Sequence, residues 1–167
     1  MIKLEKVCDA ISLSDLDKIE KEIDCKLPTD FKEFIRFSNG GKPVNRIFPV
    51  PLDGDAVLDE FYSINLTKSF ANEFMVTLNE SYLKIASDIS GNLVLLSISD
   101  RQNGVYYLDL ENNDQSLSKL SNSFTEFVAS LQSEDQSLES IRQENPEVVE
   151  SFLEKLERFE RESGIRK

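Results

Sequence analysis

The stretch LVLLSISDRQNGVYYLDL, residues 93–110, indicates the fold class of this chain. Residues 93–98 and 105–110 are apolar at nearly every position, which predicts two β-strands that are covered on both faces. The pair Asn103-Gly104 between them is a hairpin signal, because a tight turn between two strands favours residues that tolerate positive φ. The stretch therefore predicts a β-hairpin.

Segments before this hairpin extend the predicted sheet. Residues 57–62 and 82–86 are rich in aliphatic and aromatic side chains, and each segment predicts a strand. Between residues 65 and 79 the pattern is less regular. There Phe70, Phe74 and Met75 are compatible with a short helix and also with a loop packed on the sheet.

Two helices are predicted before the sheet. The first begins at one of two competing capping boxes, Ser14 with Asp17 or Ser12 with Asp15. It ends before Pro28, because proline disfavours helical geometry in the residue that precedes it. Its apolar side consists of Leu16, Ile19 and Ile23.

The second predicted helix begins at Thr29 as its cap and carries Asp30 in its first turn, where the helix dipole favours an anion. The sequence Asn39-Gly40-Gly41 ends it, since glycine adopts the left-handed conformation without a steric penalty. Its buried side is formed by Phe31, Phe34 and Ile35.

A closing helix is predicted over residues 123–131, where Ser123 and Glu126 form a capping box. Residues 132–137 are polar and are interpreted as a linker. A final helix follows, with Asn145 as its cap and Pro146 at its first position. Its apolar side packs either on the same domain, or on a partner or a second copy of the chain. That side consists of Val148, Val149, Phe152, Leu153, Leu156 and Phe159.

These elements together predict a single α+β domain over residues 1–132 and a C-terminal extension over residues 133–167. The domain is expected to contain a mainly antiparallel or mixed β-sheet, flanked by the two N-terminal helices and the closing helix. The chain has 167 residues, of which 40% are apolar, so one domain of this length buries a sizeable core without disulfides or metals.

The charge is strongly negative and unevenly distributed. The net charge is −12, and the sequence pI is about 4.5. Residues 53–114 carry eleven acidic and three basic side chains, whereas residues 1–52 carry nine of each. Such a chain repels phosphate, so direct binding to nucleic acid or to an anionic membrane is not expected and a basic partner is favoured.

Several kinds of chemistry are disfavoured by the sequence. There is no histidine, which excludes His-based triads and His metal sites. Neither a nucleophile-elbow motif nor a phosphate-binding glycine loop is present, and we expect no cofactor. The acidic run Asp53-Gly54-Asp55, with Asp59 and Glu60 downstream, lacks EF-hand spacing, so we interpret it as an acidic loop and predict no metal site.

Cys8 and Cys25 are not in a metal-binding spacing and are interpreted as reduced thiols of a cytoplasmic protein. Residues 1–13 mix charges with apolar residues and show no signal-peptide pattern. The longest aliphatic run, residues 93–96, is too short to span a bilayer.

The order helix, Leu-Pro, helix, Asn-Gly-Gly, sheet and closing helix resembles the SUKH superfamily, the Smi/Knr-like immunity proteins and cell-wall assembly regulators. The resemblance covers roughly residues 13–131. Two positions depart from the family pattern: Asp24 stands where glycine is frequent, and Leu108 where tryptophan is frequent. The matching residues are Glu20, Ile23, Leu27-Pro28, Phe31, Phe34, Asn39-Gly40-Gly41, Phe61-Tyr62, Ile85-Ala86, Asp88, Gly91-Asn92, Gly104-Val105-Tyr106, Asp109, Ser123-Phe124, Phe127 and Leu131.

The resemblance implies a bacterial immunity protein that neutralises a cognate toxin, for which a nuclease is the expected kind, or alternatively a non-catalytic scaffold module in a regulatory assembly. It brings no catalytic residues. A third interpretation, an unrecognised carboxylate hydrolase, would require paired acids with a raised pKa in a deep pocket. For the immunity interpretation, the expected partner-binding residues are the acids on loops and strand ends: Asp53, Asp55, Asp59, Glu60, Asp100, Glu111 and Asp114.

Overall fold

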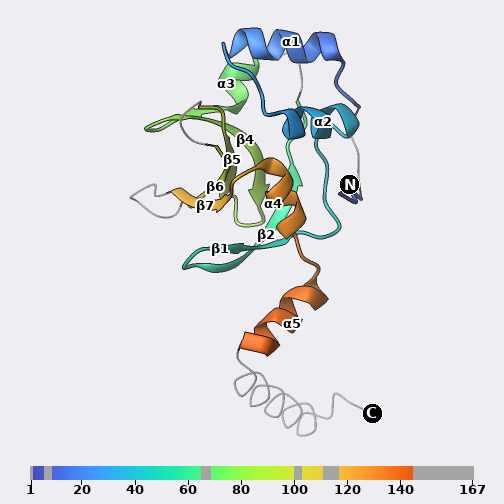
Figure 1. Ribbon diagram of the computed structural model, residues 1–167, viewed down its shortest axis with the longest axis vertical. Helices are drawn as coiled ribbons and strands as arrows, with labels where there is room; N and C mark the ends of the chain where they lie inside the picture. Colours follow the sequence, from blue (N-terminus) through green and yellow to red (C-terminus); the bar gives the residue numbers. More distant parts are fainter. Residues whose placement is uncertain (1, 6–8, 65–68, 100–102, 111–116, 145–167) are drawn as a thin grey trace, which may run out of the picture. The chain divides into compact units, whose positions relative to one another are not determined.

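The computed structural model describes residues 2–5, 9–64, 69–99, 103–110 and 117–144. The chain divides into two compact units, residues 1–131 and 132–167. The described residues of the first form the sheet and four helices, which Figure 1 shows. The second contains one described helix.

The sheet of the first unit is antiparallel throughout, and the α+β fold class is confirmed. Its strand order is β1-β2-β4-β5-β6-β7, and β3 also pairs with β4. Since β1 also contacts β7, the sheet curls around its core. The strands are β1 Ile47–Val50, β2 Gly54–Phe61, β3 Met75–Thr77, β4 Ser81–Asp88, β5 Leu93–Ser97, β6 Val105–Leu108 and β7 Leu117–Ser121.

The predicted hairpin is confirmed as β5 and β6. Leu93 pairs with Leu108 and Leu96 pairs with Val105, in antiparallel register. Residues 100–102 of its turn lie outside the described residues. Both faces of these strands are covered, as the apolar run predicted. The inner face joins the main core, and the outer face forms a smaller cluster around Tyr82, Leu95 and Tyr106.

The first helix, α1 Leu13–Glu22, resolves the competition between the two capping boxes. The Ser12 hydroxyl oxygen accepts a hydrogen bond from the Asp15 amide at 3.2 Å, so the Ser12 alternative is correct. The helix ends before Pro28, as predicted. Asp24 follows the helix with φ of 50°, in the left-handed region that favours glycine. This agrees with the family pattern described above, in which glycine is frequent at this position.

The second helix, α2 Thr29–Phe37, begins one residue earlier than predicted. Its N-cap is Pro28, which makes no side-chain cap, so the assignment of Thr29 as the cap was wrong. The Asp30 carboxylate accepts from the Phe31 amide at 2.9 Å and serves the first turn. Asn39 and Gly40 have φ of 44° and 91°, which confirms the predicted left-handed end.

Residues 69–77 contain both a helix and a strand. The short helix α3 Phe70–Phe74 buries Phe70 and Phe74, and β3 follows it directly.

The helix α4 Phe124–Ser130 confirms the predicted closing helix. Its capping box is present, since the Ser123 hydroxyl oxygen accepts from the Glu126 amide at 3.1 Å.

The second unit begins differently from the prediction. The helix α5 Glu134–Glu144 occupies most of the segment interpreted as a linker. Ser133 and Gln136 form a capping box that the polar composition obscured: each side chain accepts from the other's backbone amide. Asn145, Pro146 and the predicted apolar side beyond them lie outside the described residues.

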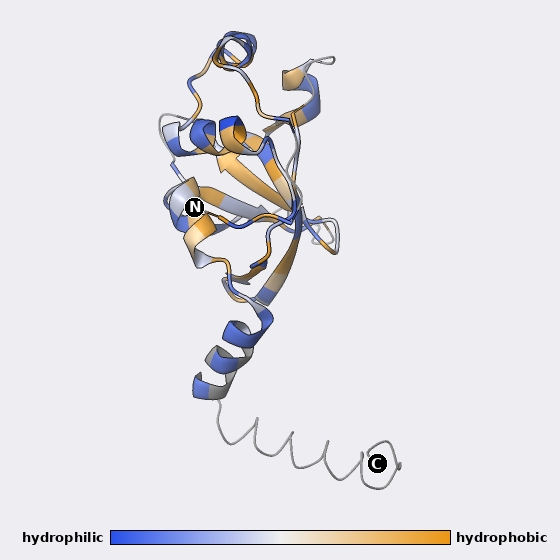
Figure 2. Ribbon diagram, turned by 90° about the vertical axis from the view of Figure 1, so that its right-hand side faces the viewer, coloured by the Kyte–Doolittle hydropathy of each residue, from blue (hydrophilic) through white to orange (hydrophobic). Residues whose placement is uncertain are grey.

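The main core is built from aromatic side chains between the sheet and the helices α2 and α4. The Phe34 ring lies 4.9 Å from that of Phe61 and 5.0 Å from that of Phe124. The Phe127 ring lies 5.5 Å from that of Phe48 in β1. In Figure 2 the central strands are predominantly hydrophobic, whereas the helices alternate hydrophobic and hydrophilic residues, as expected for helices with one buried side.

Candidate functional site

The β1–β2 hairpin is firmly attached to the core at its base. Four pairs in register, from Ile47 with Val57 to Val50 with Gly54, join the two strands. Phe48 is 1% exposed and Val50 is 4% exposed, so this face of β1 is buried up to its last residue, whereas Pro49 on the opposite face is exposed. The Asp53 amide donates to the Val50 carbonyl oxygen at 3.1 Å and closes the turn. The turn is therefore presented on a rigid support.

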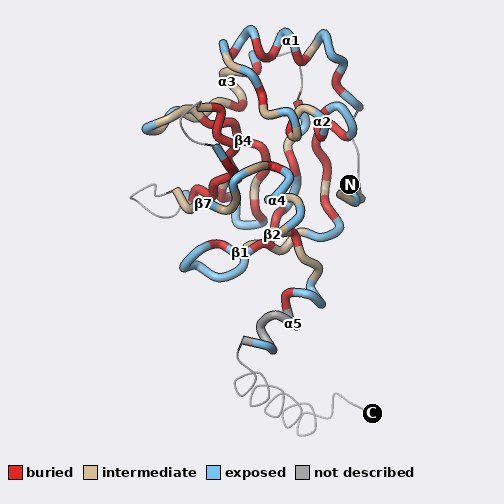
Figure 3. The backbone as a smooth tube through the Cα atoms, in the orientation of Figure 1, coloured by how far each residue is buried: buried red, intermediate tan, exposed pale blue. Residues whose placement is uncertain are grey.

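The tip of this hairpin, residues 51–55, is exposed at every position. Figure 3 shows this exposed loop directly beside the buried part of β1. Leu52 has φ of 74° and Gly54 has φ of 85°. Leu52 is fully exposed, at 105% of its reference area.

Four of the acids predicted to bind a partner lie on this hairpin. Asp53 and Asp55 are on the tip, and both are exposed. Asp59 and Glu60 lie further along β2 and are also exposed. Consecutive strand residues normally point to opposite faces, but the register of β2 against β4 shifts between Leu58 and Glu60, and this irregularity leaves both acids exposed.

The charge of this set is partly compensated. A carboxylate oxygen of Asp59 lies 3.9 Å from the Lys42 Nζ. Because this pair is exposed on both sides, it contributes little to stability. The remaining predicted acids, Asp100, Glu111 and Asp114, lie outside the described residues.

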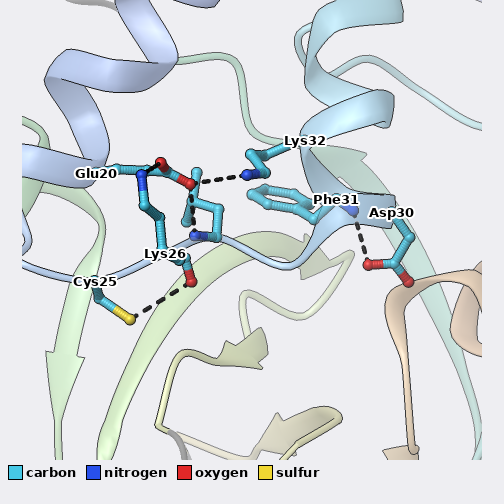
Figure 4. A network of polar contacts seen from close by, with 7 residues as sticks. Glu20, Cys25, Lys26, Asp30, Phe31 and Lys32 are labelled. Atoms are coloured by element: carbon cyan, nitrogen blue, oxygen red, sulfur yellow. Dashed lines mark hydrogen bonds and ion pairs between the residues drawn. The ribbon is translucent and has the colours of Figure 1, made fainter.

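Glu20 is a buried acid. From the sequence it was named only among the residues that match the family pattern, and no contacts were predicted for it. One carboxylate oxygen accepts from the Leu27 amide and from the Lys32 Nζ, both at 3.0 Å, and the other pairs with the Lys26 Nζ. Figure 4 shows these contacts tying the end of α1 to the start of α2. Burial opposes ionisation of Glu20, but these hydrogen bonds outweigh it and lower its pKa to about 2.

Asp30 connects α2 to α4. One of its carboxylate oxygens accepts from the Phe31 amide, as Figure 4 shows, and the other accepts from the Thr125 amide at 2.8 Å. Asp30 therefore serves the first turns of α2 and α4 at once. The sequence predicted its place in the first turn of α2 but not its contact with α4. Glu20 and Asp30 are both committed to structural contacts.

A buried polar network joins the end of β4, the turn that precedes β5, and β6. The Asp88 carboxylate accepts from the Tyr107 hydroxyl at 2.7 Å and from the Asn92 amide at 2.8 Å. The Asn92 side chain accepts from the Leu110 amide. Burial, together with the Asp88 contact, raises the pKa of Tyr107. Tyr107 could not be singled out from the sequence, because it lies within a run of apolar strand residues.

An apolar groove of about 750 Å³ lies between α2, α4 and the N-terminal segment. Asp30 and Glu33 are among the charged residues at its edge. Phe37 and Val44 in its wall are 50% and 40% exposed. The groove differs in chemistry from the acidic hairpin and includes none of its residues.

The described residues do not provide the arrangement that the hydrolase interpretation requires. The buried acids among them are Glu20, which is paired with two lysines, and Asp88, which is bound to Tyr107 and Asn92. Within the same residues, no three acidic or cysteine side chains gather closely enough to hold a metal ion. None of the described helices is both long and apolar enough to cross a bilayer.

The first unit is a small α+β domain. It consists of two helices, a curled antiparallel sheet with an exposed acidic hairpin, and a closing helix, in the order that the sequence predicted. The model of the SMI1 / KNR4 family (SUKH-1) matches residues 10–130, and the chain belongs to this family. Proteins of this family generally bind other proteins and are generally non-catalytic, which is consistent with an immunity or a regulatory role. A search of curated proteins found no match.

Proposed function

We propose that this protein is a cytoplasmic immunity protein that binds and neutralises a cognate toxin domain, and that it performs no catalysis itself. The partner is a basic protein domain, of which a nuclease is the expected kind. Nucleases bind a polyanion and therefore carry basic clefts, which an acidic protein can cover.

The observation that carries this proposal is the rigid acidic hairpin. Its base is buried through Phe48 and Val50, while Asp53 and Asp55 at the tip and Asp59 and Glu60 beside it are exposed. Acids held on a rigid support create a negative field that accelerates capture of a cationic partner and disfavours partners of the wrong charge. The net charge of −12 acts in the same direction over longer distances.

Neutralisation can be tested directly in cells. Where a neighbouring gene encodes a toxin domain, that domain is expressed from an inducible promoter, with and without the protein. We expect growth only when the protein is present. Equal killing in both cultures would overturn the proposed function.

The acidic surface makes a more specific prediction. Replacing Asp53, Asp55 and Asp59 by asparagine should slow association with the toxin domain about ten-fold at low salt and flatten its salt dependence, because steering depends on unscreened charge. Stopped-flow association with an inactive toxin variant, measured over a salt series, checks this.

The matched control removes three exposed acids elsewhere: Asp9→Asn, Asp17→Asn and Glu139→Gln. This triple variant has the same net charge as the hairpin variant, so a local effect of the hairpin separates from a general effect of charge. Equal slowing in both variants would show that the hairpin has no special role.

The second candidate role is a non-catalytic scaffold module in a regulatory assembly. Family membership is consistent with it. A protein that protects no cell from a toxin, but is recovered with a defined complex whose assembly requires it, would favour this role.

A further inference from the structure

Leu52 is an outlier in two independent respects. At 105% it is more exposed than Ile89 at 62% or Leu13 at 61%, the next most exposed large apolar residues in the described part of the chain. It also has φ of 74°, whereas the other described non-glycine residues with positive φ are an aspartate and an asparagine. Those two residue types tolerate this conformation, while leucine does so poorly.

The folded protein gains nothing from leucine at this position. A fully exposed side chain contributes no burial, and the left-handed backbone would be better served by glycine or asparagine. A residue that breaks two local rules without a compensating contact in its own fold is expected at a functional site.

The support under Leu52 reduces the cost of using it in binding. Val50, two residues before it, is 4% exposed, and the Asp53 amide donates to the Val50 carbonyl oxygen. Because the turn is held in place before any partner arrives, little conformational entropy is lost when it is bound.

We propose that Leu52 is the apolar anchor of the partner interface and inserts into a leucine-sized apolar pocket of a partner protein. Asp53 and Asp55 follow the anchor in the same exposed turn, so the rim of that pocket is basic where it faces them. The inference rests on the proposed function and names the contact that holds the complex together, in addition to the acids that guide its formation.

The test measures binding of the full-length protein to an inactive form of the toxin domain encoded next to this gene. Burial of one leucine side chain corresponds to roughly ten- to hundred-fold in affinity. We therefore expect Leu52→Ala to raise Kd at least ten-fold, through faster dissociation. The salt dependence of association should not change, because no charge is removed.

Two further variants make the result specific. Leu13→Ala removes another exposed leucine, from α1, and should leave Kd within two-fold of the wild type. Leu52→Asn removes the apolar side chain but suits the positive φ, so it should weaken binding while raising Tm. A Tm that does not fall in either Leu52 variant excludes misfolding as the cause of weaker binding.

The possible failures are distinguishable. If the wild type binds the toxin domain and Leu52→Ala binds equally well, the anchor is wrong while the proposed function stands. If the wild type does not bind or neutralise the domain at all, the proposed function is wrong, and the anchor with it.

Discussion

Glu20 shows how strongly one side chain can depend on neighbours that are not adjacent in sequence. Its carboxylate is 5% exposed and holds Lys26 and Lys32 together with the Leu27 amide. Replacing it by glutamine keeps a group that can accept from Leu27 but removes the charge. Lys26 and Lys32 are 81% and 29% exposed, so solvent can take over part of their interactions. We expect Glu20→Gln to lower the free energy of unfolding at pH 7 by about 1–2 kcal/mol, measured by urea titration.

The effect of Glu20→Gln should depend on pH. The pKa of Glu20 is about 2 in the folded protein, against 4.5 as its ordinary value. Because the folded pKa is the lower one, the stabilisation is fully present above pH 4.5 and is lost as the pH falls towards 2. The difference between wild type and variant should therefore shrink over this range. The exposed Glu33→Gln serves as control, and a difference that stays constant down to pH 2 would contradict the role of the ionised carboxylate.

Residues of this kind mark the limit of prediction from sequence. The cap Ser123 was predicted, and Ser12 was one of two alternatives for the first helix, because the partner of each lies three positions away. The partners of Glu20 lie beyond a turn, and Tyr107 meets Asp88 from a different strand. Contacts of this kind depend on the three-dimensional register of elements, which a single sequence does not display.

At the scale of elements, Gly104 and Gly91 form a natural pair for comparison. Both have positive φ, at 131° and 89°. A Cβ at Gly104 would overlap the Ser121 carbonyl oxygen of the neighbouring strand, whereas a Cβ at Gly91 would meet nothing within 4 Å. Gly91→Ala should cost about 1 kcal/mol of stability from backbone strain alone. Gly104→Ala should cost about 2–4 kcal/mol, because β7 must also move.

Thermal and urea unfolding of the two variants check this ranking. Similar losses for both would mean that β7 moves aside easily, and that the close approach at Gly104 is not required. The comparison also tests why glycine is required at position 104. There it provides the positive φ of the turn and leaves room for the neighbouring strand β7.

Elements with strong local patterns were predicted, and elements with weak ones were not. The strands β5 and β6 are nearly continuous apolar runs, and the segments 57–62 and 82–86, rich in aliphatic and aromatic side chains, indicated β2 and β4. By contrast, β1 contains Pro49, which is compatible only with an edge strand and argues against a strand in general. The sequence LSKLS of β7 is short and half polar, and it becomes a strand because β6 supplies its hydrogen-bond partners.

At the scale of the whole molecule, the charge distribution was predictable, but its arrangement in space was only partly so. The excess of acids in residues 53–114 is read directly from the sequence, and the structure places four of them on one hairpin. Glu60 joins Asp59 on the exposed side because of a register shift, which no sequence pattern announced. Leu52 could be recognised as important only after its exposure and φ were known.

The division of the chain into two units leads to a last prediction. The described buried residues of the main core cluster all belong to the first unit, between Ile11 and Leu131. Removing residues 133–167 should therefore leave a cooperatively folding domain with the Tm of the full chain to within a few degrees.

We propose that the extension, with its predicted apolar side around Phe152, mediates pairing of two copies. Sedimentation should then show a smaller species after truncation. A truncated chain that fails to fold would place the extension in the core instead.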